Sequence, residues 1–290
     1  MPTQLDLKRR IRSVRNTQQI TRAMKFVAAA RLRRAQERAF AARPYARALS
    51  AVVRSAAARI PETAHPLLQR RPEERVLLLV VSGERGLCGG FNANVLRRAI
   101  EFLRGRSSPQ GAEVMALGRK GRDALRKQRW TMTAEYVDIG ARVQSQRAAE
   151  IAKAVTGRYQ AGEVDAVYIV FNEFKSVLTQ TLTLEKLLPI EPVAVGAGPA
   201  AGEIPVDYLY EQPGGQLLER LFPRYVEAQV FRALAESAAA EHAARMTAMD
   251  SATNNARELI DKLTLYMNKV RQAAITKEII EIVSGAASAG

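Results

Sequence analysis

The sequence is poor in the residues that build disulfides and metal sites. It contains one cysteine, Cys88, and two histidines, His65 and His242, among 290 residues. One cysteine excludes an internal disulfide and fits a reducing compartment. So small a supply of sulfur and imidazole ligands also argues against a His/Cys metal cluster. We therefore expect neither a metal nor a cofactor.

Long hydrophobic runs are also lacking. No segment approaches the roughly 18 to 20 consecutive apolar residues that a membrane span requires. The first fifteen residues are basic, but they lack the apolar run and the small-residue cleavage site of a signal peptide. These absences predict a chain that stays on the side of the membrane where it is made and does not insert into the bilayer.

Glycine and proline are absent from residues 224–284, with Pro223 just before this segment and Gly285 just after it. Proline and glycine in these places are start and stop signals for one very long helix, which usually requires a coiled-coil partner. Apolar or small residues recur in it at alternating steps of four and three, the spacing of a heptad seam. The predicted seam consists of Met249, Thr253, Ala256, Ile260, Leu263, Met267, Val270 and Ala274.

The N-terminal segment supplies a partner helix. Residues 3–43 also lack glycine and proline, and Pro44 is expected to kink or end the helix, with a continuation to Ile60. The predicted apolar stripe breaks strict heptads between its third and fourth members; it consists of Leu7, Ile11, Val14, Ile20, Met24 and Val27. Antiparallel pairing of the two terminal helices leaves the middle of the chain as an insertion.

That middle segment has the pattern of an α/β domain. Residues 75–81 form a continuous apolar run, which is typical of a buried parallel strand. Helical and strand patterns then alternate, which implies a mostly parallel, Rossmann-like sheet with right-handed crossovers. We thus predict an N-terminal coiled-coil helix over residues 1–60, a central α/β domain over residues 75–206, and a C-terminal helix with an apolar tip over residues 207–290.

The positive charge is concentrated at one end. The chain has a formal net charge of +15, and residues 1–59 hold fifteen Lys or Arg against only Asp6 and Glu37. A basic coiled-coil protein that binds nucleic acid is therefore one alternative. However, the basic helix has few aromatic residues and a clear apolar stripe, which favours an acidic protein as the partner.

A glycine-rich turn at residues 83–90 follows the first strand and precedes a helix, which is a setting that can cradle phosphate. A nucleotide-binding α/β enzyme is therefore a second alternative. Yet the turn lacks the Lys-Ser/Thr of a P-loop, and its glycines are not spaced as Gly-x-Gly-x-x-Gly. We interpret Gly86, Cys88, Gly89 and Gly90 as a structural turn with a buried cysteine.

The end of the C-terminal helix is unusually apolar. Several sides of the helix are covered by Ile275, Ile279, Ile280, Ile282 and Val283. An exposed apolar tip normally inserts into another protein.

The motifs together resemble the gamma subunit family of F-type ATP synthases. The resemblance is carried by residues 275–287 and 236–256 near the C-terminus, by residues 11–30 near the N-terminus, and by the shorter segments 86–92 and 208–211. It implies a non-catalytic rotor shaft that couples proton flow to ATP synthesis or hydrolysis on the beta subunits and regulates ATPase activity. The implied location is the cytoplasmic face of a bacterial inner membrane.

The resemblance also implies partners and roles for particular residues. The apolar tip would turn inside the hexamer of alpha and beta subunits, and the α/β domain would stand on the membrane c-ring beside the epsilon subunit, with no nucleic acid bound. Met24 and Lys25 would face the beta lever loops, and Arg271 and Gln272 would form a catch on beta. Tyr210 and Glu211 would belong to the foot on the c-ring.

Overall fold

The structure, a computed structural model, describes residues 3–106, 111–139, 145–192 and 214–289. The chain divides into two compact units, an α/β unit (Ala30–Ala244) and a helical unit (Met1–Ala29 with Arg245–Gly290). The elements are α1 (Gln4–Ala57), two short 3-10 helices (Glu62–Ala64 and Pro66–Leu68), β1 (Val76–Val81), α2 (Phe91–Arg104), β2 (Ala112–Leu117), α3 (Arg119–Lys127), β3 (Met132–Tyr136), α4 (Ser145–Gln160), β4 (Ala166–Phe174), β5 (Gln180–Leu188) and α5 (Gly214–Ala289).

Five strands form one sheet in the α/β unit, in the order β3-β2-β1-β4-β5. β1 pairs in parallel with both β2 and β4, and β2 pairs in parallel with β3. β5 is antiparallel to β4 and lies at one edge. Every residue of β1 is buried, as expected for a strand that is covered on both faces. The predicted mostly parallel, Rossmann-like sheet is confirmed.

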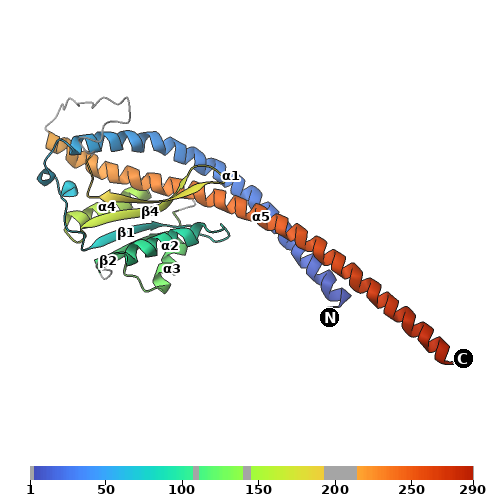
Figure 1. Cartoon of the computed structure of the whole chain (residues 1–290). Coiled ribbons are helices and arrows are strands. Elements are labelled where there is room, and N and C mark those ends of the chain that lie inside the picture. Colours follow the sequence, from blue (N-terminus) through green and yellow to red (C-terminus); the bar gives the residue numbers. More distant parts are fainter. Residues whose placement is uncertain (1–2, 107–110, 140–144, 193–213, 290) are drawn as a thin grey trace. The chain divides into compact units, whose positions relative to one another are not determined.

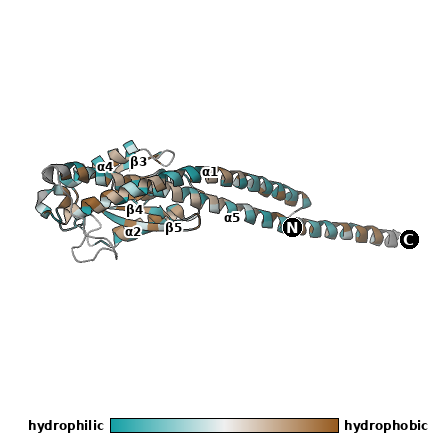
Figure 2. Cartoon of the chain, turned by 90° about the horizontal axis from the view of Figure 1, so that it is seen from above, coloured by the Kyte–Doolittle hydropathy of each residue, from teal (hydrophilic) through white to brown (hydrophobic). Residues whose placement is uncertain are grey.

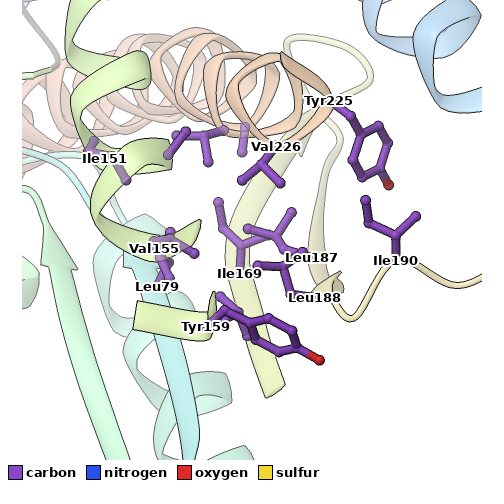
Figure 3. Packing of buried hydrophobic residues seen from close by; sticks show 14 of the residues in the cluster. Leu79, Ile151, Val155, Tyr159, Ile169, Leu187, Leu188, Ile190, Tyr225 and Val226 are labelled. Atoms are coloured by element: carbon purple, nitrogen blue, oxygen red, sulfur yellow. The ribbon is translucent and has the colours of Figure 1, made fainter. Parts of the chain in front are cut away.

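Helices cover both faces of this sheet (Figure 1). Leu78 and Val80 of β1 pack in one core beneath α2 and α3, with Val95 and Leu125. Leu79 points to the other face, where α4 and α5 lie. There Ile151 and Val155 of α4 meet Ile169 of β4, Leu187 of β5 and Val226 of α5 (Figure 3). Burying each such side chain contributes about 1.5–3 kcal/mol, so both helical layers are held to the sheet mainly by hydrophobic burial.

Within the α/β unit, α1 and α5 run antiparallel. Arg43 of α1 meets Glu236 of α5, and three residues further along α1 the carbonyl of Ala46 accepts a hydrogen bond from Gln229, seven residues earlier in α5. Increasing numbers on one helix therefore match decreasing numbers on the other. The predicted antiparallel pairing is confirmed.

The predicted continuation of the first helix beyond Pro44 is confirmed, because α1 runs through Pro44 to Ala57. The predicted ends of the second helix were wrong at Pro223 and at Gly285. α5 begins at Gly214, so that Pro223 lies inside it. α5 also passes Gly285. A proline inside a helix costs about 3 kcal/mol. Ala39 and Ala46 on either side of Pro44 are fully buried, so tertiary packing offsets this local cost.

The helical unit is an antiparallel pair with a heptad seam. Thr21 lies opposite Thr253, and Lys25 opposite Asp250. On α5 the predicted Met249, Thr253, Ala256, Ile260, Leu263, Met267 and Val270 are all buried or half-buried, whereas Ala274 is exposed. The α5 seam is thus confirmed as far as Val270.

The predicted α1 stripe was wrong at Ile20 and Val27, which are exposed. One set of buried and half-buried positions on α1 keeps an unbroken four-three spacing: Leu7, Ile11, Val14, Gln18, Thr21, Lys25, Ala28, Leu32, Ala35 and Ala39. The heptad spacing therefore continues through the polar residues Gln18, Thr21 and Lys25. Each of them occupies a seam position although its side chain is not apolar.

Glu73, just before β1, is the centre of a charged cluster at the edge of the sheet. Its carboxylate accepts hydrogen bonds from Arg106, from Lys186 at 2.9 Å and from Tyr168 at 3.0 Å. Burial alone raises the pKa of Glu73, but the hydrogen bonds from Lys186 and Arg106 outweigh it and lower the pKa from its ordinary 4.5 to about 2. The ionised form is therefore the one that stabilises the fold.

We expect this cluster to make stability depend on pH below 4.5. Because the folded pKa is depressed, the contribution of Glu73 is complete above the unfolded pKa and is lost as the pH falls from about 4.5 to about 2. Replacing Glu73 with Gln should lower the free energy of unfolding by about 3 kcal/mol at pH 7 and flatten this acid limb. Urea unfolding at pH 7 and pH 3 measures both effects. The Glu74→Gln variant is the matched control because Glu74 is exposed; equal losses from both variants would contradict the prediction.

Candidate functional site

The end of α5 is an exposed apolar helix. If the pairing of Thr21 with Thr253 and of Lys25 with Asp250 continues, the first residues of α1 lie opposite about residue 270 of α5. Residues 271–284 are all exposed, which includes Ala274, the last predicted seam position. α5 therefore extends beyond its partner within the helical unit.

Five large apolar side chains lie on this extension. They are Ile275, Ile279, Ile280, Ile282 and Val283, which are 48%, 55%, 58%, 71% and 61% exposed. Figure 2 shows the hydrophobic colour along this part of α5. Exposed apolar side chains of this kind carry a cost in hydration, which burial against another protein would remove. The role of the tip as such a binding surface stays a prediction. Within the described residues, none of the helices is both long and apolar enough to cross a bilayer.

Arg271 and Gln272 lie at the base of the extension, and both side chains are exposed. Neither side chain makes an ion pair or a hydrogen bond within the described part of the chain. An exposed guanidinium beside an exposed amide can bind a carboxylate and a backbone group on another protein. Their role as a catch stays a prediction.

Lys25 is engaged inside the helical unit. Its ammonium group lies 2.6 Å from Asp250 of α5, and the neighbouring Thr21 and Thr253 hydroxyls are 2.9 Å apart. Met24 beside it is half-buried. Polar groups at seam positions fix the register of a coiled coil, so this layer sets how α1 and α5 align. The expected contact of Met24 and Lys25 with a beta lever loop stays a prediction.

Side chains of the protein itself bind in and around the glycine-rich turn, where a phosphate would need free backbone amides. The amide of Gly83 donates to the Asn92 side chain at 2.8 Å. The Glu84 carboxylate accepts hydrogen bonds from the amides of Ile139 and Arg119. A Cβ added at Gly83 would lie 2.9 Å from the carboxyl carbon of Glu241, so a buried carboxylate also faces the turn. The occupied amide and the two carboxylates make the turn unfavourable for binding an anion.

The residues predicted to form the turn lie between β1 and α2. Cys88 is buried, and its sulfur accepts a hydrogen bond from Asn92 at 3.2 Å. Gly89 has φ of 56°, a left-handed conformation that favours glycine. Gly86 and Gly90 flank them. In the described residues, no group of three or more His, Cys, Asp or Glu side chains is placed to hold a metal ion.

We therefore expect no intrinsic binding of ATP. Isothermal titration calorimetry of the full chain with MgATP should give no saturable heat at micromolar concentrations, because the Gly83 amide is occupied and Glu241 repels phosphate. Stoichiometric binding near micromolar affinity would contradict this expectation.

One buried ion pair escaped the sequence analysis. Arg43 of α1 donates two hydrogen bonds to Glu236 of α5, at 2.5 and 2.8 Å, and a third to the carbonyl of Phe174 in β4. The amide of Phe174 in turn donates to Glu236 at 3.0 Å. Two helices and the sheet are thus joined by one carboxylate. The available signal was a glutamate within the alanine-rich segment of α5.

Tyr210 and Glu211, expected at a foot, lie outside the described residues, and their role stays a prediction.

Comparison with known proteins identifies the relatives of this chain. A family model described as ATP synthase matches residues 3–289. The ATP synthase gamma chain of Solibacter usitatus (strain Ellin6076) is 53% identical over 294 residues, which cover 100% of each chain. The ATP synthase gamma chain of Desulforamulus reducens is 50% identical over 289 residues and covers 99% of each chain.

Solved structures share the fold. A chain of the Euglena gracilis mitochondrial ATP synthase, from its OSCP/F1/c-ring structure, superposes with a TM-score of 0.68 at 20% identity and covers 97% of this chain and 93% of that chain. A chain from the central stalk and c-ring of the Tetrahymena thermophila enzyme has a TM-score of 0.62 at 24% identity and covers 80% of this chain and 99% of that one.

Proposed function

The chain belongs to the ATP synthase gamma-chain family, a rotary stalk subunit of F-type ATP synthase, and from that premise we propose that it acts as a non-catalytic shaft. The observation that carries the proposal is the end of α5, where an apolar stripe beyond α1 is left exposed. A surface of this kind suits a tip that sits inside a sleeve of other subunits.

The mechanism follows from asymmetry. One shaft inside three equivalent catalytic sites presents a different face to each of them. Each site is thereby biased towards a different conformation and a different nucleotide affinity, and rotation exchanges those biases among the sites. The shaft itself needs no nucleotide, in keeping with a glycine-rich turn in which the Gly83 amide already binds Asn92.

The proposed partners are the alpha and beta subunits, the epsilon subunit and the membrane c-ring. Arg271 and Gln272 are the catch for beta, and Met24 with Lys25 lies near the beta lever loops. The α/β unit, with Tyr210 and Glu211, stands on the c-ring. The chain is then a peripheral subunit on the cytoplasmic face of a bacterial inner membrane, and it carries no cofactor.

Reconstitution with a purified bacterial alpha–beta hexamer tests the proposal. The full chain should co-elute with the hexamer and raise its ATPase activity. A bead attached to a Leu178→Cys variant should rotate stepwise when ATP is added; Leu178 is 83% exposed, so the label should not disturb folding. A chain that is folded but neither co-elutes nor rotates would overturn the proposal.

A further inference from the structure

A second surface of the α/β unit, remote in sequence from the tip, is an open cleft of about 730 Å³. α2 supplies one wall, and the connection between α3 and β3 supplies the other. The lining side chains are Arg97, Ile100, Glu101, Arg104, Gln128 and Trp130. Nothing in the proposed shaft mechanism uses them.

The cleft has an apolar floor and a positive rim. Trp130 and Ile100 are half-buried, and Trp130 packs on the core beneath α2. Arg104 is exposed and makes no side-chain hydrogen bond or ion pair in the described residues. In the same part of the chain, the side chain of Arg97 donates only to the nearby Asn94 side chain. An aromatic side chain that lines the same cleft as two such guanidinium groups favours a ligand with an apolar body and anionic ends.

The spacing of the two arginines along α2 limits which class of ligand fits the cleft. Arg97 and Arg104 are seven residues apart, which is about 10.5 Å along the helix axis. Glu101 lies between them, 3.9 Å from Arg98. A polyanion with closely and regularly spaced charges would place one negative charge against Glu101. A helix with acidic residues at i and i+7 and apolar residues at i+3 and i+4 would instead match both arginines, cover Trp130 and leave Glu101 unopposed.

We propose that this cleft docks an acidic amphipathic helix of a partner protein. Carboxylates at the two ends of the helical stripe meet Arg97 and Arg104, and the apolar residues between them pack on Trp130 and Ile100. The like charge of Glu101 rejects helices that carry an acid at the centre of that stripe.

Trp130 is the single tryptophan of the chain and therefore reports directly on the cleft. The probe is a synthetic 18-residue helical peptide without tryptophan or tyrosine, with Glu at i and i+7 and Leu at i+3 and i+4. Titration into the full chain should give a saturable shift of tryptophan emission. A peptide of the same composition with the acidic residues moved to the opposite helix face should bind at least tenfold more weakly.

Charge-reversed variants separate the cleft from general attraction. Arg104→Glu should weaken peptide binding at least tenfold, and Arg97→Glu should do the same if the first variant folds poorly. Arg47→Glu, on the exposed face of α1, changes the net charge equally and should leave binding within twofold. Equal losses from Arg104→Glu and Arg47→Glu would overturn the proposal. So would an equal or stronger emission shift with single-stranded oligothymidine or with anionic phosphatidylglycerol vesicles at the same ionic strength.

Discussion

A chain in which Glu236 is replaced by Ala will unfold with a free energy about 3 kcal/mol below that of the wild type. The Glu236 side chain is only 1% exposed, and it accepts hydrogen bonds from the Arg43 guanidinium and the Phe174 amide. Removing the carboxylate leaves a buried cation and a buried amide without their acceptor. The loss falls at the lower end of the range for a broken buried pair, because the Arg43 side chain, 21% exposed, keeps some hydration.

Urea unfolding monitored by circular dichroism measures this loss. Glu227→Ala, on the same helix, is the matched control, since Glu227 has no partner in the described residues and should change stability by less than about 0.5 kcal/mol. The double variant Arg43→Ala, Glu236→Ala should lose less than the sum of the two single variants, because the groups act as one unit. Strict additivity would show that the ion pair does not carry the effect.

The same contact has a mechanical consequence. Glu236 joins α1, α5 and the end of β4 within the α/β unit, so it holds the helices to the sheet that is proposed to stand on the c-ring. Hydrophobic burial favours contact but is not directional, whereas a bidentate ion pair fixes orientation. A shaft under torque needs this second property.

Elements with a strong local signal could be predicted from the sequence. The apolar run of β1 and the alternating helices and strands gave the α/β sheet, because burial on both faces leaves a continuous apolar pattern. The α5 seam was predicted because most of its members are apolar. In each case the local pattern and the tertiary environment agree.

Elements whose stability depends on a distant partner could not be predicted from the sequence. The α1 seam passes through Gln18, Thr21 and Lys25, and apolar periodicity alone led instead to Ile20 and Val27. Thr21 and Lys25 belong at the interface because Thr253 and Asp250 lie opposite them. Pairings across more than 200 residues leave no mark in local spacing.

The candidate site divides in the same way. The apolar tip was identified because five large apolar side chains crowd one helix end. The Arg43 and Glu236 pair was missed, since a single charge in a helix normally indicates a solvated face. Arg104 on α2 likewise gave no sign of a binding site in the sequence, because only the structure places it in one cleft with Trp130.

Replacing both Arg271 and Gln272 with Ala should lower the rate of ATP synthesis by at least tenfold while leaving assembly and melting nearly intact. Both side chains are exposed, so their removal costs the folded chain little. If each rotor angle directs them to one beta subunit, the loss of a charge-assisted bond worth about 1.5–3 kcal/mol removes the bias that distinguishes that site from the other two. Proton-driven synthesis in reconstituted vesicles measures the effect. Lys269→Ala removes an equal charge about 200° around the same helix, so it should keep at least half of the activity. A double variant that assembles and turns over like the wild type would remove the catch from the mechanism and leave the shaft alone.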